Sequence, residues 1–118
     1  MEAHGTGTAL GDPIEVSSIA AIAAGSCQAC HVFGIKGNVG HTESTAGVAN
    51  VVEVATQLCC GEKAGNVQLR ALNPQVNQVR ADALVLPADT HRLPGARAQS
   101  GGASSFGWSG IIAHGVFE

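Results

Sequence analysis

The chain has 118 residues, of which 45% are hydrophobic and only 13% are charged, which suits one globular domain or a piece of a larger one. Its net charge of −3, with six lysine and arginine residues, argues against a nucleic-acid surface or a polybasic membrane patch. No apolar run is long enough to span a bilayer, and the residues after Met1 do not resemble a signal peptide. Four cysteines without secretory features favour a reduced compartment. We therefore expect a soluble cytoplasmic protein, with an organelle such as a plastid as the alternative.

The N-terminal residues 2–8 read EAHGTGT, a run of glycine and threonine around a histidine that is typical of a loop leaving a strand. Such loops often carry functional residues at the end of a sheet. Asp12, Pro13 and Glu15 then predict the start of a helix, because Asp can cap, Pro fits the first turn and Glu completes a capping box. Gly25 is the expected end of this helix.

A second strand–loop–helix pattern follows the first. Residues 32–35 predict a short buried strand, and residues 36–42 form a glycine-rich loop with polar side chains. We expect a second helix over about residues 42–60, ended by Gly61. Its apolar residues form one stripe, with Asn50, Glu53 and Gln57 on other faces; the stripe contains Val48, Val51, Val52, Ala55, Leu58 and Cys59.

The last third of the chain has a weaker pattern. Residues 72–74 predict a turn, and residues 83–86 predict a short strand bounded by Pro87. Two further segments, 99–106 and 111–118, can pair as a hairpin through the turn at 107–110. Because strands alternate with helices, the sequence indicates an α/β fold.

Three motifs, in this order, resemble those of β-ketoacyl synthases. Residues 2–8 with 11–15 are similar to the family's first histidine motif, and residues 36–43 followed by Ala46-Gly47 to its lysine and second-histidine motif. Residues 104–110 followed by Ala113-His114 are similar to its glycine-rich motif. The resemblance covers essentially the whole chain, and its closest variety is the ketosynthase of type I polyketide synthases and fatty-acid synthases.

The resemblance implies a thiolase-like α/β fold, in which two related halves stack into five layers (α-β-α-β-α). Residues 1–118 match only the later part of the second half, so we expect a single, incomplete domain. The family's nucleophilic cysteine lies upstream, in a turn of small residues before a helix. No cysteine of this chain has that setting; the four are Cys27, Cys30, Cys59 and Cys60.

The activity that the resemblance implies is a decarboxylative Claisen condensation of an acyl thioester with a malonyl thioester. No cofactor is bound directly, because both substrates are carried on the phosphopantetheine of an acyl carrier protein. The implied partners are this carrier protein, the remainder of the ketosynthase domain and a second copy of the full-length parent. Without the upstream cysteine, this chain by itself is not expected to condense acyl groups.

The resemblance also implies the roles of single residues. His4 and His41 would donate hydrogen bonds to the malonyl thioester carbonyl, where negative charge develops during decarboxylation. Lys36 would supply fixed positive charge, with Glu43 as a candidate partner. The oxyanion hole for the acyl thioester and the gate to the acyl pocket would involve Phe106, Gly107 and Trp108.

The chain also departs from the family's pattern. Ile111 and Ile112 stand where the family usually carries Thr and Asn, Trp108 stands for the more usual Phe, and Gly37 for the more usual Ser. The alternative is a non-catalytic ketosynthase-like partner, of the chain-length-factor type, which an absent upstream cysteine in the parent would select. The Cys27-x-x-Cys30-His31 sequence leaves a metal-binding module as a third hypothesis, although no second Cys-x-x-Cys pair is present and we expect no metal.

Overall fold

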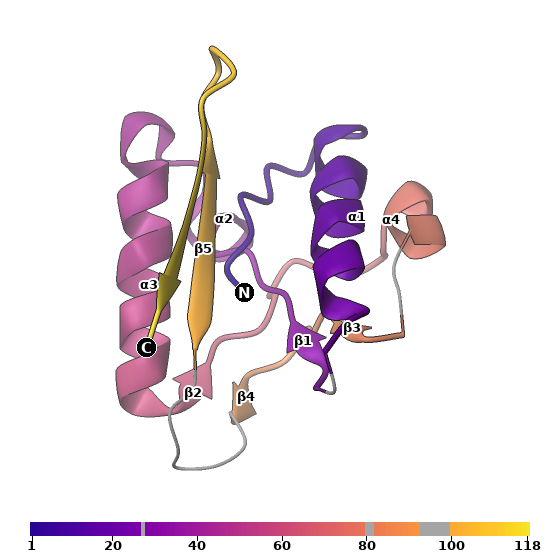
Figure 1. Ribbon diagram of the computed structural model, residues 1–118. Helices are drawn as coiled ribbons and strands as arrows, with labels where there is room; N and C mark the ends of the chain where they lie inside the picture. The colour runs from indigo at the N-terminus through magenta and orange to yellow at the C-terminus, as the bar shows by residue number, and fades with distance from the viewer. Residues whose placement is uncertain (27, 80–81, 93–99) are drawn as a thin grey trace.

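The computed structural model describes residues 1–26, 28–79, 82–92 and 100–118, a mixture of helices and strands (Figure 1). The helices are α1 (Gly11–Ala23), α2 (Lys36–Val39), α3 (Ala46–Cys60) and α4 (Pro74–Val79), with a 3₁₀ turn at Glu43–Thr45. The strands are β1 (Cys30–His31), β2 (Glu62–Lys63), β3 (Leu84–Val85), β4 (His91–Arg92), β5 (Gly101–Phe106) and β6 (Ile112–Phe117). Within these ranges, no helix combines the length and the hydrophobicity that a membrane crossing requires.

The N-terminal segment joins the two sides of the molecule. Glu2 forms parallel bridges with Phe33 and with Ala103 of β5, so the segment lies between the chain after β1 and the C-terminal hairpin. Beyond it, β1 pairs in parallel with β3, whereas β5 and β6 pair antiparallel, as the sequence predicts for the hairpin. His4 therefore leaves the end of a central strand-like segment.

The hydrophobic core lies beneath α1. Val16, Ile19, Ala20 and Ala23 of this helix are buried against residues of the N-terminal segment, β3 and α4. Burying a valine or leucine side chain stabilises a fold by about 1.5–3 kcal/mol. This packing fixes α1 beside the N-terminal segment that leads into it, as Figure 1 shows.

Helix α3 packs on β5 through a face that the apolar pattern did not indicate. Its buried residues are Ala46, Asn50, Val54 and Gln57. The valines of the apolar stripe point away from this contact, and Val48 is 64% exposed. The close approach depends on Gly101, since a Cβ there would lie 2.6 Å from Val54 Cγ1.

Several predicted boundaries need correction, and two short helices, α2 and α4, were missed. The strand expected at residues 32–35 lies earlier, at Cys30–His31, and the loop expected at residues 36–42 contains α2. Helix α1 begins at Gly11, so Asp12 lies inside the helix rather than at its N-cap, and Leu10 at the N-cap makes no side-chain cap. Helix α3 begins at Ala46, after the 3₁₀ turn, but ends at Gly61 as predicted, with φ 67° there. The turn predicted at residues 72–74 leads into α4. The sequence does carry a signal for the start of α4. Asn73 precedes the helix, and its Oδ1 accepts the N–H of Gln75 at 2.9 Å, as the side chain of an N-cap residue does.

Candidate active site

The loop after the central segment places His4. The imidazole Nδ1 of His4 accepts a hydrogen bond from the backbone N–H of Phe106 at 3.2 Å, and the two rings lie 5.0 Å apart. Gly5 and Gly7 adopt φ angles of 50° and 73°, which other residues rarely adopt. These two glycines allow the chain to turn sharply from the end of the segment toward α1.

Two carboxylates of α1 bind this loop instead of capping the helix. Glu15 Oε1 accepts the N–H of His4 at 2.7 Å, and its Oε2 accepts the N–H of Gly5 at 3.0 Å. Asp12 Oδ1 accepts the N–H of Gly7 at 3.1 Å. The capping roles predicted for Asp12 and Glu15 are therefore wrong. Both side chains hold the backbone around His4.

Burial raises the pKa of both carboxyls above its ordinary value. The backbone N–H groups of Gly5 and His4 oppose that shift at Glu15, and those of Gly7, Thr8 and Thr6 oppose it at Asp12. The hydrogen bonds therefore offset part of the cost of placing two negative charges under the loop.

His41 is held in the same way as His4. Its Nδ1 accepts the backbone N–H of Glu43 at 2.9 Å, and Glu43 has a positive φ of 49°. The His4 and His41 rings meet edge to face, with their centroids 6.0 Å apart. Because each Nδ1 is an acceptor, the proton of each neutral imidazole lies on Nε2. The two histidines therefore lie together, and the pair offers two N–H donors.

Lys36 lies at the start of α2, outside the lining of the cleft that the two histidines share. Its Nζ donates to Asn50 Oδ1 at 3.4 Å, so its partner is Asn50 rather than the predicted Glu43. Burial lowers the pKa of Lys36, and the charges of Glu2 and Glu15 oppose this shift. Burial also lowers the pKa of His4, and Lys36 and then His41 lower it further. The lysine therefore acts on His4 through its charge.

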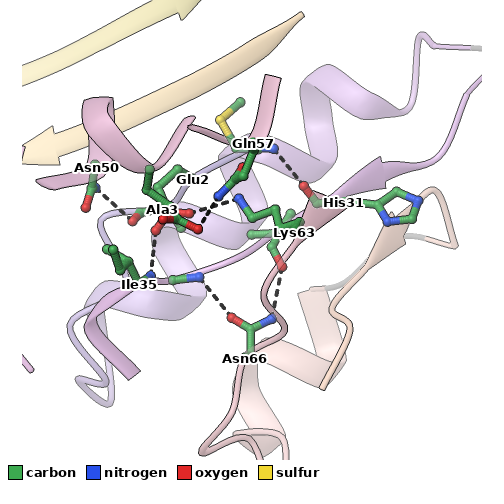
Figure 2. A network of polar contacts seen from close by, with 12 residues as sticks. Glu2, Ala3, His31, Ile35, Asn50, Gln57, Lys63 and Asn66 are labelled. Atoms are coloured by element: carbon green, nitrogen blue, oxygen red, sulfur yellow. Dashed lines mark hydrogen bonds and ion pairs between the residues drawn. The ribbon is translucent and has the colours of Figure 1, made fainter. Parts of the chain in front are cut away.

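A buried ion pair holds the backbone at Ile35, directly before α2 (Figure 2). Glu2 Oε2 lies 3.0 Å from Lys63 Nζ, and the two side chains are 0% and 2% exposed. Glu2 Oε1 accepts the backbone N–H of Ile35 at 2.6 Å. The ammonium of Lys63 also lies 3.8 Å from the ring centroid of Phe33. Neither Glu2 nor Lys63 was a sequence candidate, because nothing in the residue pattern distinguishes a buried charge from a solvated one.

Five of the six predicted site residues line one open cleft of about 1350 Å³, which is larger than most small-molecule sites. These five are His4, His41, Phe106, Gly107 and Trp108, whereas Lys36 does not line the cleft. The Trp108 side chain is fully exposed at the tip of the β5–β6 turn. That turn is closed by the N–H of Gly107, which donates to Ile111 O at 2.6 Å.

The metal hypothesis gains no support from the described part of the chain. Within it, no group of three or more His, Cys, Asp or Glu side chains is placed to hold an ion. Cys27 lies outside the described residues. Cys30 is half-buried, and Cys59 and Cys60 are exposed.

Comparison with known proteins identifies the family. Residues 1–69 match the model of the β-ketoacyl synthase C-terminal domain. The whole chain is 38% identical to part of a highly reducing polyketide synthase of Aspergillus niger and 35% identical to part of an erythronolide synthase of Saccharopolyspora erythraea. It spans only 5% and 3% of their lengths.

Solved structures agree with the sequence relatives. Ketosynthase twelve of the Bacillus amyloliquefaciens bacillaene polyketide synthase superposes with a TM-score of 0.85 at 32% identity. The module 6 ketosynthase of the Bacillus subtilis bacillaene synthase gives 0.87 at 29%. Each comparison covers 98% of this chain and 21% of the ketosynthase. The fold is thus part of a thiolase-like α/β fold, and the chain belongs to the β-ketoacyl synthase family, matching the C-terminal part of a polyketide-synthase ketosynthase.

Proposed function

We propose that residues 1–118 supply the decarboxylating side of a ketosynthase active site, in which the two imidazole Nε2–H groups bind the malonyl thioester carbonyl. The observation that carries this proposal is that a backbone N–H occupies Nδ1 of both His4 and His41, in rings 6.0 Å apart. Both proton-bearing nitrogens therefore remain for a substrate. Two fixed donors stabilise negative charge that develops on a carbonyl oxygen.

In this proposal the malonyl group arrives on the phosphopantetheine of an acyl carrier protein. The bond between the malonyl carboxylate and its α-carbon breaks, CO₂ leaves, and the electron pair forms an enolate. The enolate oxygen accepts the two histidine hydrogen bonds. The α-carbon then attacks an acyl thioester on a cysteine outside these residues, and the cysteine thiolate leaves as the new carbon–carbon bond forms.

Lys36 has an electrostatic role in the proposal. A protonated His4 could not accept the Phe106 N–H at Nδ1, so the donor arrangement requires the neutral imidazole. Burial and the charge of Lys36 lower the pKa of His4 and so favour that neutral form. The lysine charge also favours an enolate nearby over the neutral thioester.

The β5–β6 turn serves the acyl half of the reaction. The backbone N–H of Trp108 contributes to the oxyanion hole of the acyl thioester, and Phe106 and Gly107 form the gate to the acyl pocket. Support comes from their position, because these three residues line the same cleft as the histidines and Phe106 contacts the His4 ring.

Several exposed apolar side chains fit a role inside a larger domain. On the face of α3 that β5 leaves uncovered they are Val48 and Val52, in β6 they are Ile112 and Val116, and just before β6 is Ile111. Large exposed apolar patches mark surfaces that another partner covers. In the proposal the remainder of the ketosynthase domain covers them, and the complete domain forms a homodimer.

The test uses the full-length polypeptide that contains these residues, with malonyl and acyl carrier-protein thioesters as substrates. Release of CO₂ and formation of β-ketoacyl product are followed by mass spectrometry. We expect His4→Ala and His41→Ala each to lower decarboxylation by roughly a hundredfold or more. Gln68→Ala, at an exposed position outside the histidine cleft, is the control.

Ile111 and Ile112 support a second candidate function. They replace residues that normally make hydrogen bonds in the family, and their side chains are exposed. A full-length protein that neither releases CO₂ nor condenses would therefore be a non-catalytic ketosynthase-like partner. That result would contradict the first proposal.

A further inference from the structure

Asn50 is a buried polar residue in the middle of α3. Its side-chain Nδ2 donates to Ala3 O at 3.1 Å and to Ser104 O at 2.8 Å. Its Oδ1 accepts from Lys36 Nζ at 3.4 Å. The residue is 1% exposed, so water cannot replace these partners. A buried amide is tolerated only when its hydrogen-bonding groups are satisfied, and Asn50 satisfies its own with three separate segments.

Each of the three segments acts on His4. Ala3 directly precedes His4 in the chain. Ser104 lies two residues before Phe106, whose N–H holds the His4 imidazole. Lys36 is the charge that lowers the pKa of His4 after burial. One side-chain amide therefore connects the backbone, the ring and the electrostatic partner of the same histidine.

We propose that Asn50 is a positioning residue, which sets the orientation of the His4 imidazole and holds the Lys36 ammonium near it. The inference rests on the proposed function of His4. Asn50 acts only through Ala3, Ser104 and Lys36, and it does not line the cleft.

The geometry requires an amide at this position. Two backbone carbonyls need N–H donors and one ammonium needs an oxygen, a combination that a single Asn side chain provides. An aspartate would pair with Lys36 but would turn a carboxylate oxygen toward a carbonyl. A leucine of similar size would leave the two carbonyls buried without this partner and would remove the hydrogen bond of Lys36.

The charge at position 50 matters as much as its shape. His4 faces the charges of Lys36 and His41, and Lys36 in turn faces Glu2 and Glu15. Because Asn50 is neutral, it holds Lys36 without cancelling its effect on His4. A carboxylate there would neutralise the lysine and favour the imidazolium form of His4.

The experiment compares Asn50→Asp with Asn66→Asp in the full-length polypeptide, with pH profiles of malonyl decarboxylation as the readout. Asn66 is a matched control: its amide also makes three hydrogen bonds, to the Gly34 N–H and to the carbonyls of Val32 and Pro87. For Asn50→Asp we expect the acid limb to move up by about 1 pH unit. The acid limb of the pH profile of Asn66→Asp should stay where it is in the unmodified protein.

A second pair, Asn50→Leu and Asn66→Leu, tests orientation without charge. Misplacing a catalytic group commonly costs roughly 10- to 100-fold in rate, so kcat of Asn50→Leu should fall by that factor with KM unchanged. Combining it with Lys36→Met should cost less than the product of the two single losses. Urea unfolding of each variant verifies that it is folded.

The outcomes separate the two proposals. If the unmodified full-length polypeptide does not decarboxylate the malonyl thioester, the proposed function itself is overturned. An active protein whose Asn50 and Asn66 variants share the same pH limb and kcat would overturn the role of Asn50 alone. If the Asn50 variants do not fold, the test is an NMR titration of the unmodified protein. The side-chain amide resonance of Asn50 should then shift with pH together with the resonances of His4. A resonance that does not shift with pH would overturn the inference.

Discussion

Glu15 binds the backbone of His4 directly, through a hydrogen bond of 2.7 Å from the His4 N–H to Glu15 Oε1. The second carboxylate oxygen binds the next N–H, that of Gly5, at 3.0 Å. Helix α1 thereby fixes the histidine loop through a residue that lies eleven positions later in the chain. The same pair of contacts makes the loop sensitive to any change at Glu15.

Glu15→Gln should therefore loosen the His4 loop. The amide can accept only one of the two N–H groups with its oxygen, and its NH₂ group faces the other. We expect a loss of about 1–3 kcal/mol in the free energy of unfolding, measured by urea denaturation. Decarboxylation should fall with it. Glu53→Gln, on α3, is the control, and equal losses in both variants would contradict a specific role for Glu15.

The pH dependence of Glu15 has a defined sign. Burial is the largest cause of the shift, and it holds the pKa of Glu15 above the unfolded value of about 4.5. Between the unfolded and the folded pKa, the folded protein therefore binds the proton more tightly than the unfolded chain does. The contribution of Glu15 to stability is thus largest at low pH and is lost as the pH rises through the folded pKa. As the pH rises, the free energy of unfolding of the unmodified protein should therefore fall relative to that of Glu15→Gln, measured by urea denaturation at each pH. An opposite slope would contradict the pKa direction.

Lys36→Met should shift the pH dependence of decarboxylation. Burial lowers the pKa of His4 first, and the charge of Lys36 lowers it further, so the neutral imidazole persists below the ordinary pKa of about 6.5. Activity should rise with pH through the His4 pKa. Removing the lysine charge raises that pKa, and the acid limb should move to higher pH. Arg70→Met, an exposed site, is the control.

Asp12→Ala should destabilise the chain by about 1 kcal/mol, through the loop rather than through a helix cap. The bond that it removes is the one from the Gly7 N–H at 3.1 Å. The measurement is the midpoint of chemical denaturation, with Asp12→Asn as the variant that retains an acceptor. If the midpoint stayed the same while activity disappeared, Asp12 would instead take part in the chemistry.

Lys63→Met should lower the free energy of unfolding more than the double variant that also carries Glu2→Gln. The variant leaves the Glu2 carboxylate, 0% exposed, without its ammonium partner. Breaking a buried pair in this way typically costs about 3–5 kcal/mol. Adding Glu2→Gln should recover a large part of that loss in urea denaturation. Additive losses in the double variant would show that the pair has no coupling.

Gly101→Ala should weaken the contact between β5 and α3. A new Cβ would lie 2.6 Å from Val54 Cγ1, so one of the two elements must move. Overpacking of this kind costs about 1–3 kcal/mol in unfolding free energy. Val54→Ala should relieve the clash and partly restore the Gly101→Ala variant. Gly37→Ala is the control, because nothing lies within 4 Å of its added Cβ.

The sequence predicted the parts of the site that depend on motifs. His4 and His41 stand in ordered motifs, and the glycine-rich turn between β5 and β6 could be recognised from its composition. The hairpin and the end of α3 at Gly61 followed from the same kind of local signal. These features depend on backbone conformation, which nearby residues largely determine.

The remaining features depend on which surfaces meet. The valine stripe of α3 predicted an apolar face, but β5 covers the face with Asn50 and Gln57 instead. Likewise Asp12 and Glu15 match a capping box in sequence, yet the loop of His4 lies close enough to take both carboxylates. Neither outcome can be derived from spacing along one element, because each depends on contacts between distant segments.

In α3, the residue that sets the orientation of the helix and the residues that offer apolar contact area lie on different faces. Hydrogen bonds have preferred directions, so the amide of Asn50 permits one rotation of the helix on β5, whereas methyl groups on the other side tolerate small shifts. The helix is therefore aligned from the side that carries Asn50, whatever covers its exposed valines. A layer that docks on those valines meets a surface whose orientation is already set, and it can contribute binding energy without having to define the position of the histidines.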